Sequence, residues 1–183
     1  MAAVLRHLPD RWQAVGRPSA VKVHQVKSVL VVCAANICRS PSAALLLAAE
    51  LEARGTPLTV MSAGVTAVGG RPACDLALAL VGRYAPRTYA FEGAEEVSVS
   101  GIAHVSRRVS ADDVREATLV IAMEQWQVDE VTALDPLAAV RLLDLNADIP
   151  DPHAIGYQAH AMVFEQVRHA VAVLADELAA EYR

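Results

Sequence analysis

A cysteine and an arginine stand close together where a hydrophobic segment meets a helix-forming segment. A β-branched apolar run ends at Cys33, and Arg39 follows directly before Ser40 and Pro41. A loop of this length between a strand and a helix can turn its backbone N–H groups inward, toward the oxygens of a phosphate. The guanidinium of Arg39 can close such a ring with two parallel hydrogen bonds. The spacing therefore indicates a phosphate site with a cysteine nucleophile.

The same residues have a plainer interpretation. Cys33 and Cys38 are of a type that is often buried as a small apolar side chain, and Arg39 could be a surface charge. An arginine in the first turn of a helix opposes the helix dipole, so stability alone does not favour it there. The helix N terminus, the loop amides and Arg39 would instead favour the thiolate, which is the nucleophilic form of cysteine. Ser40 could donate its hydroxyl to the sulfur or cap the helix.

The segments that must position this loop alternate between strand-like and helix-like patterns. The predicted strands are 27–32, 58–63, 117–123 and 140–145, and the predicted helices are 40–54, 73–81 and 155–178. Strands that alternate with helices predict an α/β fold: one domain with a four-stranded parallel sheet and helices on both faces.

Parallel sheets of this kind bind ligands at the carboxyl ends of their strands. Cys33 lies at such an end, and so do segments 63–64 and 123–124. The segment after the last predicted strand holds Asp148 and Asp151, and it should reach the same rim. Either carboxyl group could donate a proton to a leaving oxygen, although Asp151 before a proline could also form a simple turn.

The chain resembles the low-molecular-weight protein tyrosine phosphatases, whose signature is a strand, Cys-x-Gly-Asn-x-Cys-Arg-Ser-Pro and a helix. The matching loop residues are Cys33, Asn36, Ile37, Cys38, Arg39, Ser40 and Pro41. Ala35 replaces the usual glycine, and we expect the left-handed position at Asn36, which tolerates positive φ well. With further matches at 62–64, 123–124 and 151–152, the resemblance covers roughly residues 27 to 180.

The resemblance implies hydrolysis of phosphomonoesters through a phosphocysteine intermediate, with inorganic phosphate as the product. Cys33 is then the nucleophile, Arg39 and the loop amides bind phosphate, and Asp151 acts first as acid and then as base. The remaining loop and supporting residues are Ala34, Ala35, Asn36, Ile37, Cys38, Ser40 and His104. No metal is required, and no group of residues has the spacing of metal ligands.

Other residues have smaller expected roles. His104 matches a family histidine that supports the phosphate loop, and Glu124 is expected on the rim in a supporting role. Cys38 could form a reversible disulfide with Cys33 or simply pack within the loop. We expect Cys74 to be structural or partly exposed.

The resemblance leaves the substrate open between a phosphotyrosine protein and a small phosphorylated metabolite. Phosphotyrosine-selective members carry aromatic side chains beside the loop, but segments 65–70 and 153–155 contain no phenylalanine, tyrosine or tryptophan. Tyr157 or an aromatic residue of 84–91 could compensate. Residues 84–100 form a longer connection than is usual in the family, and we predict an inserted lid or partner surface there.

Composition limits the possible classes of protein. The 183 residues suit one domain, and a net charge of −5 without a basic run argues against nucleic-acid binding. No apolar run is long enough to span a membrane, and the N terminus lacks a signal-peptide core. Three cysteines, an odd number, favour a reducing compartment, so we expect a cytoplasmic protein. Residues 1–26 are expected to extend from a domain formed by 27–183; the oligomeric state is left open.

Two other functions use a similar loop. A self-contained arsenate reductase needs a downstream pair of cysteines to relay a disulfide. Because no cysteine follows Cys74, only a version supplied by an external small thiol remains. An inactive phosphate-binding regulatory module is the other alternative. The retention of Cys33, Arg39 and Asp151 argues against that module.

Overall fold

A parallel sheet at the centre of the molecule carries the cysteine loop. The computed structural model describes residues 26–84, 104–153 and 155–182. Its strands are β1 (Ser28–Cys33), β2 (Thr59–Gly64), β3 (Leu119–Ala122) and β4 (Val140–Leu142). They lie in the order β2-β1-β3-β4, and every neighbouring pair is parallel. The predicted four-stranded parallel sheet is confirmed.

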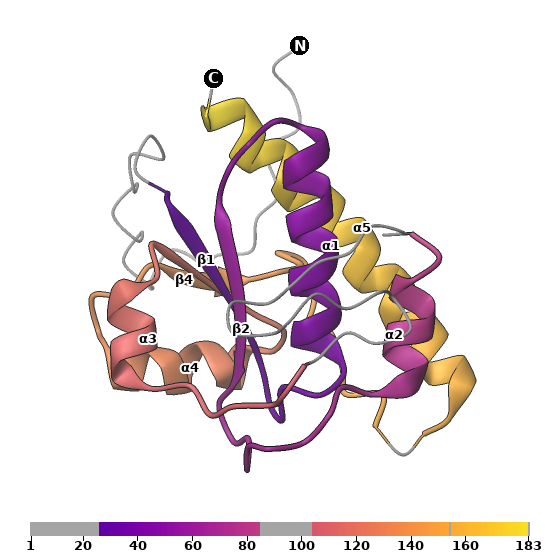
Figure 1. Cartoon of the computed structure of the whole chain (residues 1–183). Helices are drawn as coiled ribbons and strands as arrows, with labels where there is room; N and C mark the ends of the chain where they lie inside the picture. The colour runs from indigo at the N-terminus through magenta and orange to yellow at the C-terminus, as the bar shows by residue number, and fades with distance from the viewer. Residues whose placement is uncertain (1–25, 85–103, 154, 183) are drawn as a thin grey trace.

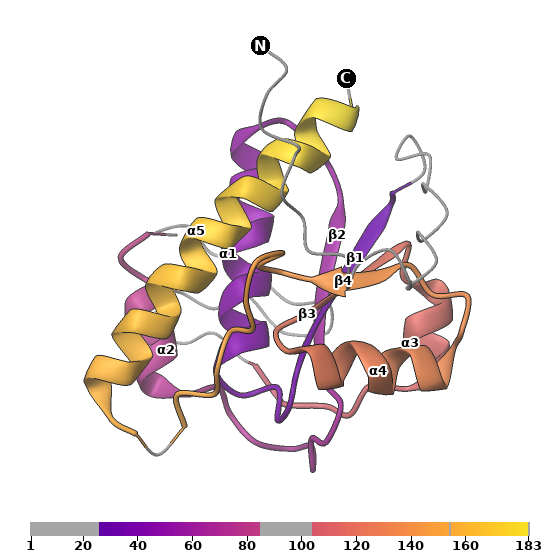
Figure 2. The same ribbon diagram turned by 180° about the vertical axis from the view of Figure 1, so that it is seen from behind.

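Helices cover both faces of this sheet (Figure 1). One face carries α1 (Arg39–Ala53), α2 (Asp75–Val81) and α5 (Tyr157–Tyr182). The other face carries α3 (Ala111–Glu116) and α4 (Gln125–Leu134), which are seen from behind in Figure 2. The result is a three-layer α/β fold, as the alternation of strands and helices predicts.

Strand β1 lies between β2 and β3 in the sheet, and both of its faces are buried. Val29 and Val31 lie in the apolar core that includes residues of α1 and α5, whereas Leu30 and Val32 lie in a second core under α3 and α4. A strand buried on both faces has no polar alternation, which explains its continuous apolar run. This placement fixes Cys33, the last residue of β1, at the centre of the carboxyl edge.

Two helices were not among the predicted ones. Helix α3 is six residues long and depends on a capping box, in which Ser110 and Asp113 satisfy each other's backbone N–H groups. Helix α4 buries only Gln127 and Val131. Neither helix has the broad apolar face that makes a helix recognisable from sequence.

Part of the predicted domain organisation falls outside the described residues. The predicted extension at 1–26 lies outside them except for Val26, and the predicted lid at 84–100 lies outside them except for Tyr84. Tyr84 is described, and its ring lies 5.6 Å from that of Phe164 and under the guanidinium of Arg168, both on α5. Tyr84 therefore packs against α5 and does not replace a missing aromatic residue beside the loop. Among the described residues, no helix combines the length and the apolar character that crossing a membrane requires.

Candidate active site

The loop between β1 and α1 surrounds the thiol of Cys33. The Ser40 Oγ lies 3.1 Å from the Cys33 Sγ, and the backbone N–H of Asn36 donates to the same sulfur over 3.3 Å. Helix α1 begins at Arg39, and its N-cap residue Cys38 makes no side-chain cap. Ser40 thus lies inside the helix beside the sulfur, and the capping alternative is wrong.

Asn36 joins the loop to two neighbouring segments. Its φ of 55° places it in the left-handed region, as predicted. Its Nδ2 donates to the Ser40 Oγ over 3.0 Å and to the Ser62 Oγ over 2.9 Å. Its Oδ1 accepts the backbone N–H of Arg107 over 3.1 Å. With every polar atom of this buried amide engaged, the loop has one well-defined conformation.

The end of β2 approaches the loop so closely that only glycine fits. A Cβ atom added to Gly64 would lie 2.6 Å from the Ala34 carbonyl oxygen and 2.8 Å from the Asn36 nitrogen. Both neighbours are backbone atoms of the loop between β1 and α1, so a side chain could be accommodated only if the loop moved.

We therefore expect Gly64→Ala to impair the loop and the fold together. The displaced loop should lower turnover of p-nitrophenyl phosphate at least about tenfold, and overpacking should reduce the free energy of unfolding by about 1–3 kcal/mol. Denaturant unfolding and steady-state kinetics measure the two effects. Gly55→Ala is the control for the clash, because no atom lies near the Cβ added there. At a φ of 67° this variant adds backbone strain without a clash. Normal kinetics in Gly64→Ala would show that the loop tolerates the movement.

His104 supports the loop from the side, in the place where the family resemblance puts a histidine. Its Nε2 lies 2.7 Å from the Asn36 carbonyl oxygen, which can only accept, so Nε2 carries the proton. Burial lowers the pKa of His104 below the usual value of 6.5, and the hydrogen bond to Asn36 opposes this only in part. The side chain is therefore neutral in the folded protein at neutral pH.

A neutral, buried His104 makes stability depend on pH. Below 6.5 the histidine of the unfolded chain takes up a proton before that of the folded chain does. Stability should fall as the pH drops through this value, and the loss should end below the folded pKa. We expect His104→Gln, which keeps a donor for the Asn36 carbonyl, to lose less stability between about pH 7.5 and pH 5. Urea unfolding across this range, with the exposed His169→Gln as control, measures the difference; equal slopes would exclude His104 as the cause.

The guanidinium of Arg39 is buried at the rim of the loop. It donates to the carboxylate of Glu124, to the Ile149 carbonyl oxygen over 2.8 Å and to the Asp151 Oδ2 over 2.8 Å. Gln127 holds Glu124 in place by donating to the same carboxylate over 3.0 Å. The predicted rim position of Glu124 agrees with this geometry. Gln127 was not among the predicted site residues.

The structure separates the two candidate acids. Asp151 pairs with Arg39, and its second oxygen accepts the backbone N–H of His153 over 3.0 Å. Asp148 instead accepts the N–H of Gln125 at the start of α4. Asp151 thus forms a turn and also faces the loop, so its two interpretations are compatible.

A pocket opens above the thiol. It is lined by Cys33, Ala35, Ile37, Cys38, Arg39, Arg71, Asp151 and His153. None of these lining residues is phenylalanine, tyrosine or tryptophan, in agreement with the sequence around the loop. Arg71 was not among the predicted site residues, because an isolated exposed arginine has no distinguishing pattern.

The second loop cysteine is chemically different from the first. Burial, and then the adjacent Cys74 thiol, raise the pKa of Cys38 far above the usual range. Cys38 is therefore a neutral thiol at neutral pH and does not compete as a nucleophile. Cys33 and Cys38 are both free, and a reversible disulfide between them stays a prediction. Cys74 is half-buried and precedes α2, within the range of its two expected roles.

Comparison with known proteins identifies the family. The family model described as low molecular weight phosphotyrosine protein phosphatase matches residues 28–183. The chain belongs to this family. It is accordingly a cysteine-dependent phosphatase, and the resemblance seen in the sequence is confirmed.

Individual members of the phosphatase family align over most of the chain. The probable low-molecular-weight protein tyrosine phosphatase AmsI of Erwinia amylovora is 34% identical over 150 residues, which are 79% of this chain and 92% of AmsI. The solved structure of Vibrio vulnificus Wzb in complex with benzylphosphonate has a TM-score of 0.70 and 25% identity, and covers 83% of this chain and 99% of its own. The solved structure of the YwlE arginine phosphatase from Geobacillus stearothermophilus has a TM-score of 0.67 and 28% identity. It covers 85% of this chain and 94% of its own.

Proposed function

We propose that this phosphatase hydrolyses phosphotyrosine side chains of proteins through a phosphocysteine on Cys33. One observation carries the proposal: the Cys33 sulfur, with hydrogen-bond donors around it, lines the same pocket as Arg39 and Asp151. The pocket thus combines a nucleophile, a planar cation for phosphate and an acid within one loop cluster.

The reaction has two steps. In the first, the Cys33 sulfur attacks phosphorus, the bond from phosphorus to the tyrosine oxygen breaks, and Asp151 gives its proton to that oxygen. In the second, Asp151 takes a proton from water, the water oxygen attacks phosphorus, and the phosphorus–sulfur bond breaks to release inorganic phosphate. Throughout, the loop N–H groups and Arg39 stabilise the negative charge on the three free oxygens.

The ion pair between Arg39 and Asp151 holds both side chains beside the loop before substrate binds. A phosphate dianion competes with the Asp151 carboxylate for the Arg39 donors, because both accept charge-assisted hydrogen bonds. Substrate binding therefore releases the Asp151 side chain from the guanidinium and leaves it beside the leaving oxygen.

The pocket walls favour a neutral aromatic leaving group. Ala35 and Ile37 offer apolar contact, and Arg71 and His153 also line the pocket. A phosphoarginine side chain would bring a guanidinium beside Arg71, where like charges repel. Relatives named as tyrosine phosphatases, and one solved with benzylphosphonate, support the same choice over a small metabolite.

Asp151→Asn tests the acid and the substrate together. The variant should lose about 10²–10³-fold in kcat on a phosphotyrosine peptide, and less on p-nitrophenyl phosphate, whose leaving group needs little protonation. Wild type should prefer the phosphotyrosine peptide to the matched phosphoarginine peptide in kcat/KM. Asp148→Asn is the matched control and should behave as wild type.

Two results would contradict this proposal. Equal losses on both esters would mean that Asp151 does not protonate the leaving group. A higher kcat/KM for the phosphoarginine peptide would assign the pocket to the other substrate and leave the cysteine chemistry untouched.

A further inference from the structure

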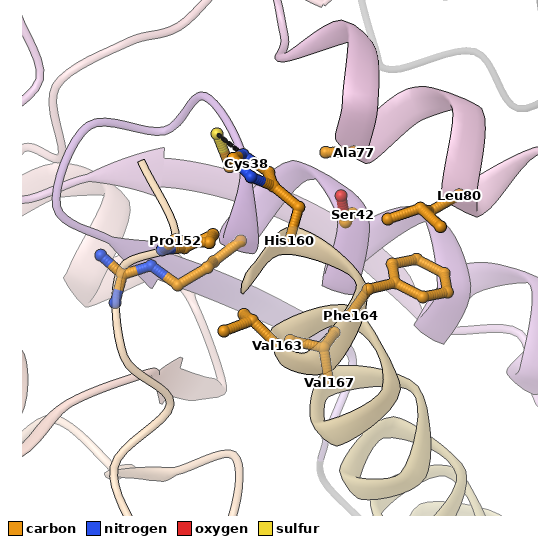
Figure 3. A pocket seen from close by; sticks show the side chains of 10 residues that line it. Cys38, Ser42, Ala77, Leu80, Pro152, His160, Val163, Phe164 and Val167 are labelled. Atoms are coloured by element: carbon orange, nitrogen blue, oxygen red, sulfur yellow. Dashed lines mark hydrogen bonds between the residues drawn. The ribbon is translucent and has the colours of Figure 1, made fainter. Parts of the chain in front are cut away.

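A second group of reactive side chains lies beside the phosphate loop. The Cys38 Sγ, the Cys74 Sγ and the His160 Nε2 all lie within 4.8 Å of one another. They come from the loop, from the residue before α2 and from the first turn of α5. Figure 3 shows Cys38 and His160 pointing toward each other in a pocket that also contains Pro152.

The separations within this group match those of ligands on one metal ion. The His160 Nε2 lies 3.4 Å from the Cys74 Sγ and 3.9 Å from the Cys38 Sγ. Tetrahedral zinc, with bonds of about 2.3 Å to sulfur and about 2.0–2.1 Å to nitrogen, places these ligand atoms about 3.6 Å apart. An ion therefore fits between them after small side-chain adjustments.

The histidine has the tautomer that a metal requires. The His160 Nδ1 lies 3.0 Å from the Gly156 carbonyl oxygen, which can only accept a hydrogen bond. Nδ1 thus carries the proton, and the lone pair of Nε2 faces the two sulfurs. A histidine held by a backbone carbonyl in this way is the usual arrangement of a metal ligand.

We propose that Cys38, Cys74 and His160 bind a zinc ion, which ties the phosphate loop to α2 and α5. Two thiolates and a neutral imidazole compensate the charge of the ion, so the site suits its buried position, and a solvent molecule can take the fourth place. Binding displaces the two thiol protons into solution, and affinity increases with pH. No redox step is involved.

From this position the ion would stabilise mainly the phosphate loop. Cys38 directly precedes Arg39, and the N–H of Cys74 already donates to the Ile37 carbonyl oxygen over 2.9 Å. The ion would strengthen this link and fix the Cys38 end of the loop against α5. Because zinc binds the folded chain, it also stabilises it in proportion to the logarithm of its concentration.

Metal titration of the full chain tests the site. Cys33→Ser serves as the parent, because it removes the catalytic thiol as a rival ligand, and a phosphine keeps the other thiols reduced. Titration with Co²⁺ should give one equivalent with a sulfur-to-cobalt charge-transfer band, which Zn²⁺ then displaces. Zn²⁺ should also raise the Tm of the parent.

Matched variants of the parent decide the outcome. Adding Cys74→Ser or His160→Ala should weaken Zn²⁺ binding at least about tenfold and remove the charge-transfer band and the Tm shift. Adding His169→Ala, which changes an exposed histidine of the same helix, should leave all three unchanged. Circular dichroism verifies that each variant is folded without metal. Absence of the band in the parent, or equal affinity in folded His160→Ala, would overturn the proposal.

Discussion

Cys33→Ser is expected to reduce turnover of p-nitrophenyl phosphate at least about a thousandfold while phosphate binding survives. The hydroxyl is a far weaker nucleophile than a thiolate, so the first step fails. The loop N–H groups and Arg39 are unchanged, so the donors that bind phosphate stay in place. Binding and chemistry should therefore separate in this one variant.

Two measurements on Cys33→Ser verify that separation. Steady-state kinetics measures turnover, and the rise in Tm with added inorganic phosphate measures binding. A phosphate-induced rise equal to or above that of wild type shows that the loop is intact. Turnover at the wild-type rate would exclude Cys33 as the nucleophile.

The second large effect is expected for Arg39→Lys. Lysine keeps the positive charge but cannot offer two parallel donors to phosphate. It also cannot reproduce the fork that reaches Glu124, Asp151 and the Ile149 carbonyl at once. We expect kcat to fall on the order of a thousandfold, because in the proposed mechanism this group stabilises the transferring phosphoryl group.

The loss of kcat in Arg39→Lys must be compared with the change in its free energy of unfolding. The half-buried Glu124 carboxylate loses a well-placed partner, so unfolding by urea should also become easier. Arg115→Lys, at an exposed arginine of α3 remote from the loop, is the matched control and should change neither quantity. Full activity in Arg39→Lys would mean that charge alone suffices and that the bidentate contact is dispensable.

The residues closest together in the sequence were the most predictable. Cys33 and Arg39 belong to one loop, and the apolar run before them is explained by a strand buried on both faces. The placement of Asp151 required more, because it depends on the rule that parallel strands end at one edge and on the family resemblance. The structure does place it against Arg39.

Contacts between distant segments could not be predicted. The fit of Gly64 against the loop is visible only from the backbone, and nothing in the pattern around Arg71 indicates the pocket. Cys74 and His160 are 86 residues apart, so no metal-ligand spacing reveals them, although their side chains nearly touch. Such contacts depend on how α2 and α5 pack against each other, and no short segment of the sequence reveals that packing.

The most direct test of the mechanism is to trap phosphate on Cys33. Asp151→Asn should accept the phosphoryl group from p-nitrophenyl phosphate and then hydrolyse it slowly, because the base for water is missing. Quenching during turnover in alkaline denaturant, followed by mass spectrometry of the peptides, should find one added phosphoryl group on the Cys33 peptide, and none after Cys33→Ser is added. A phosphoryl group on another residue, or none while product forms in a burst, would contradict the phosphocysteine mechanism.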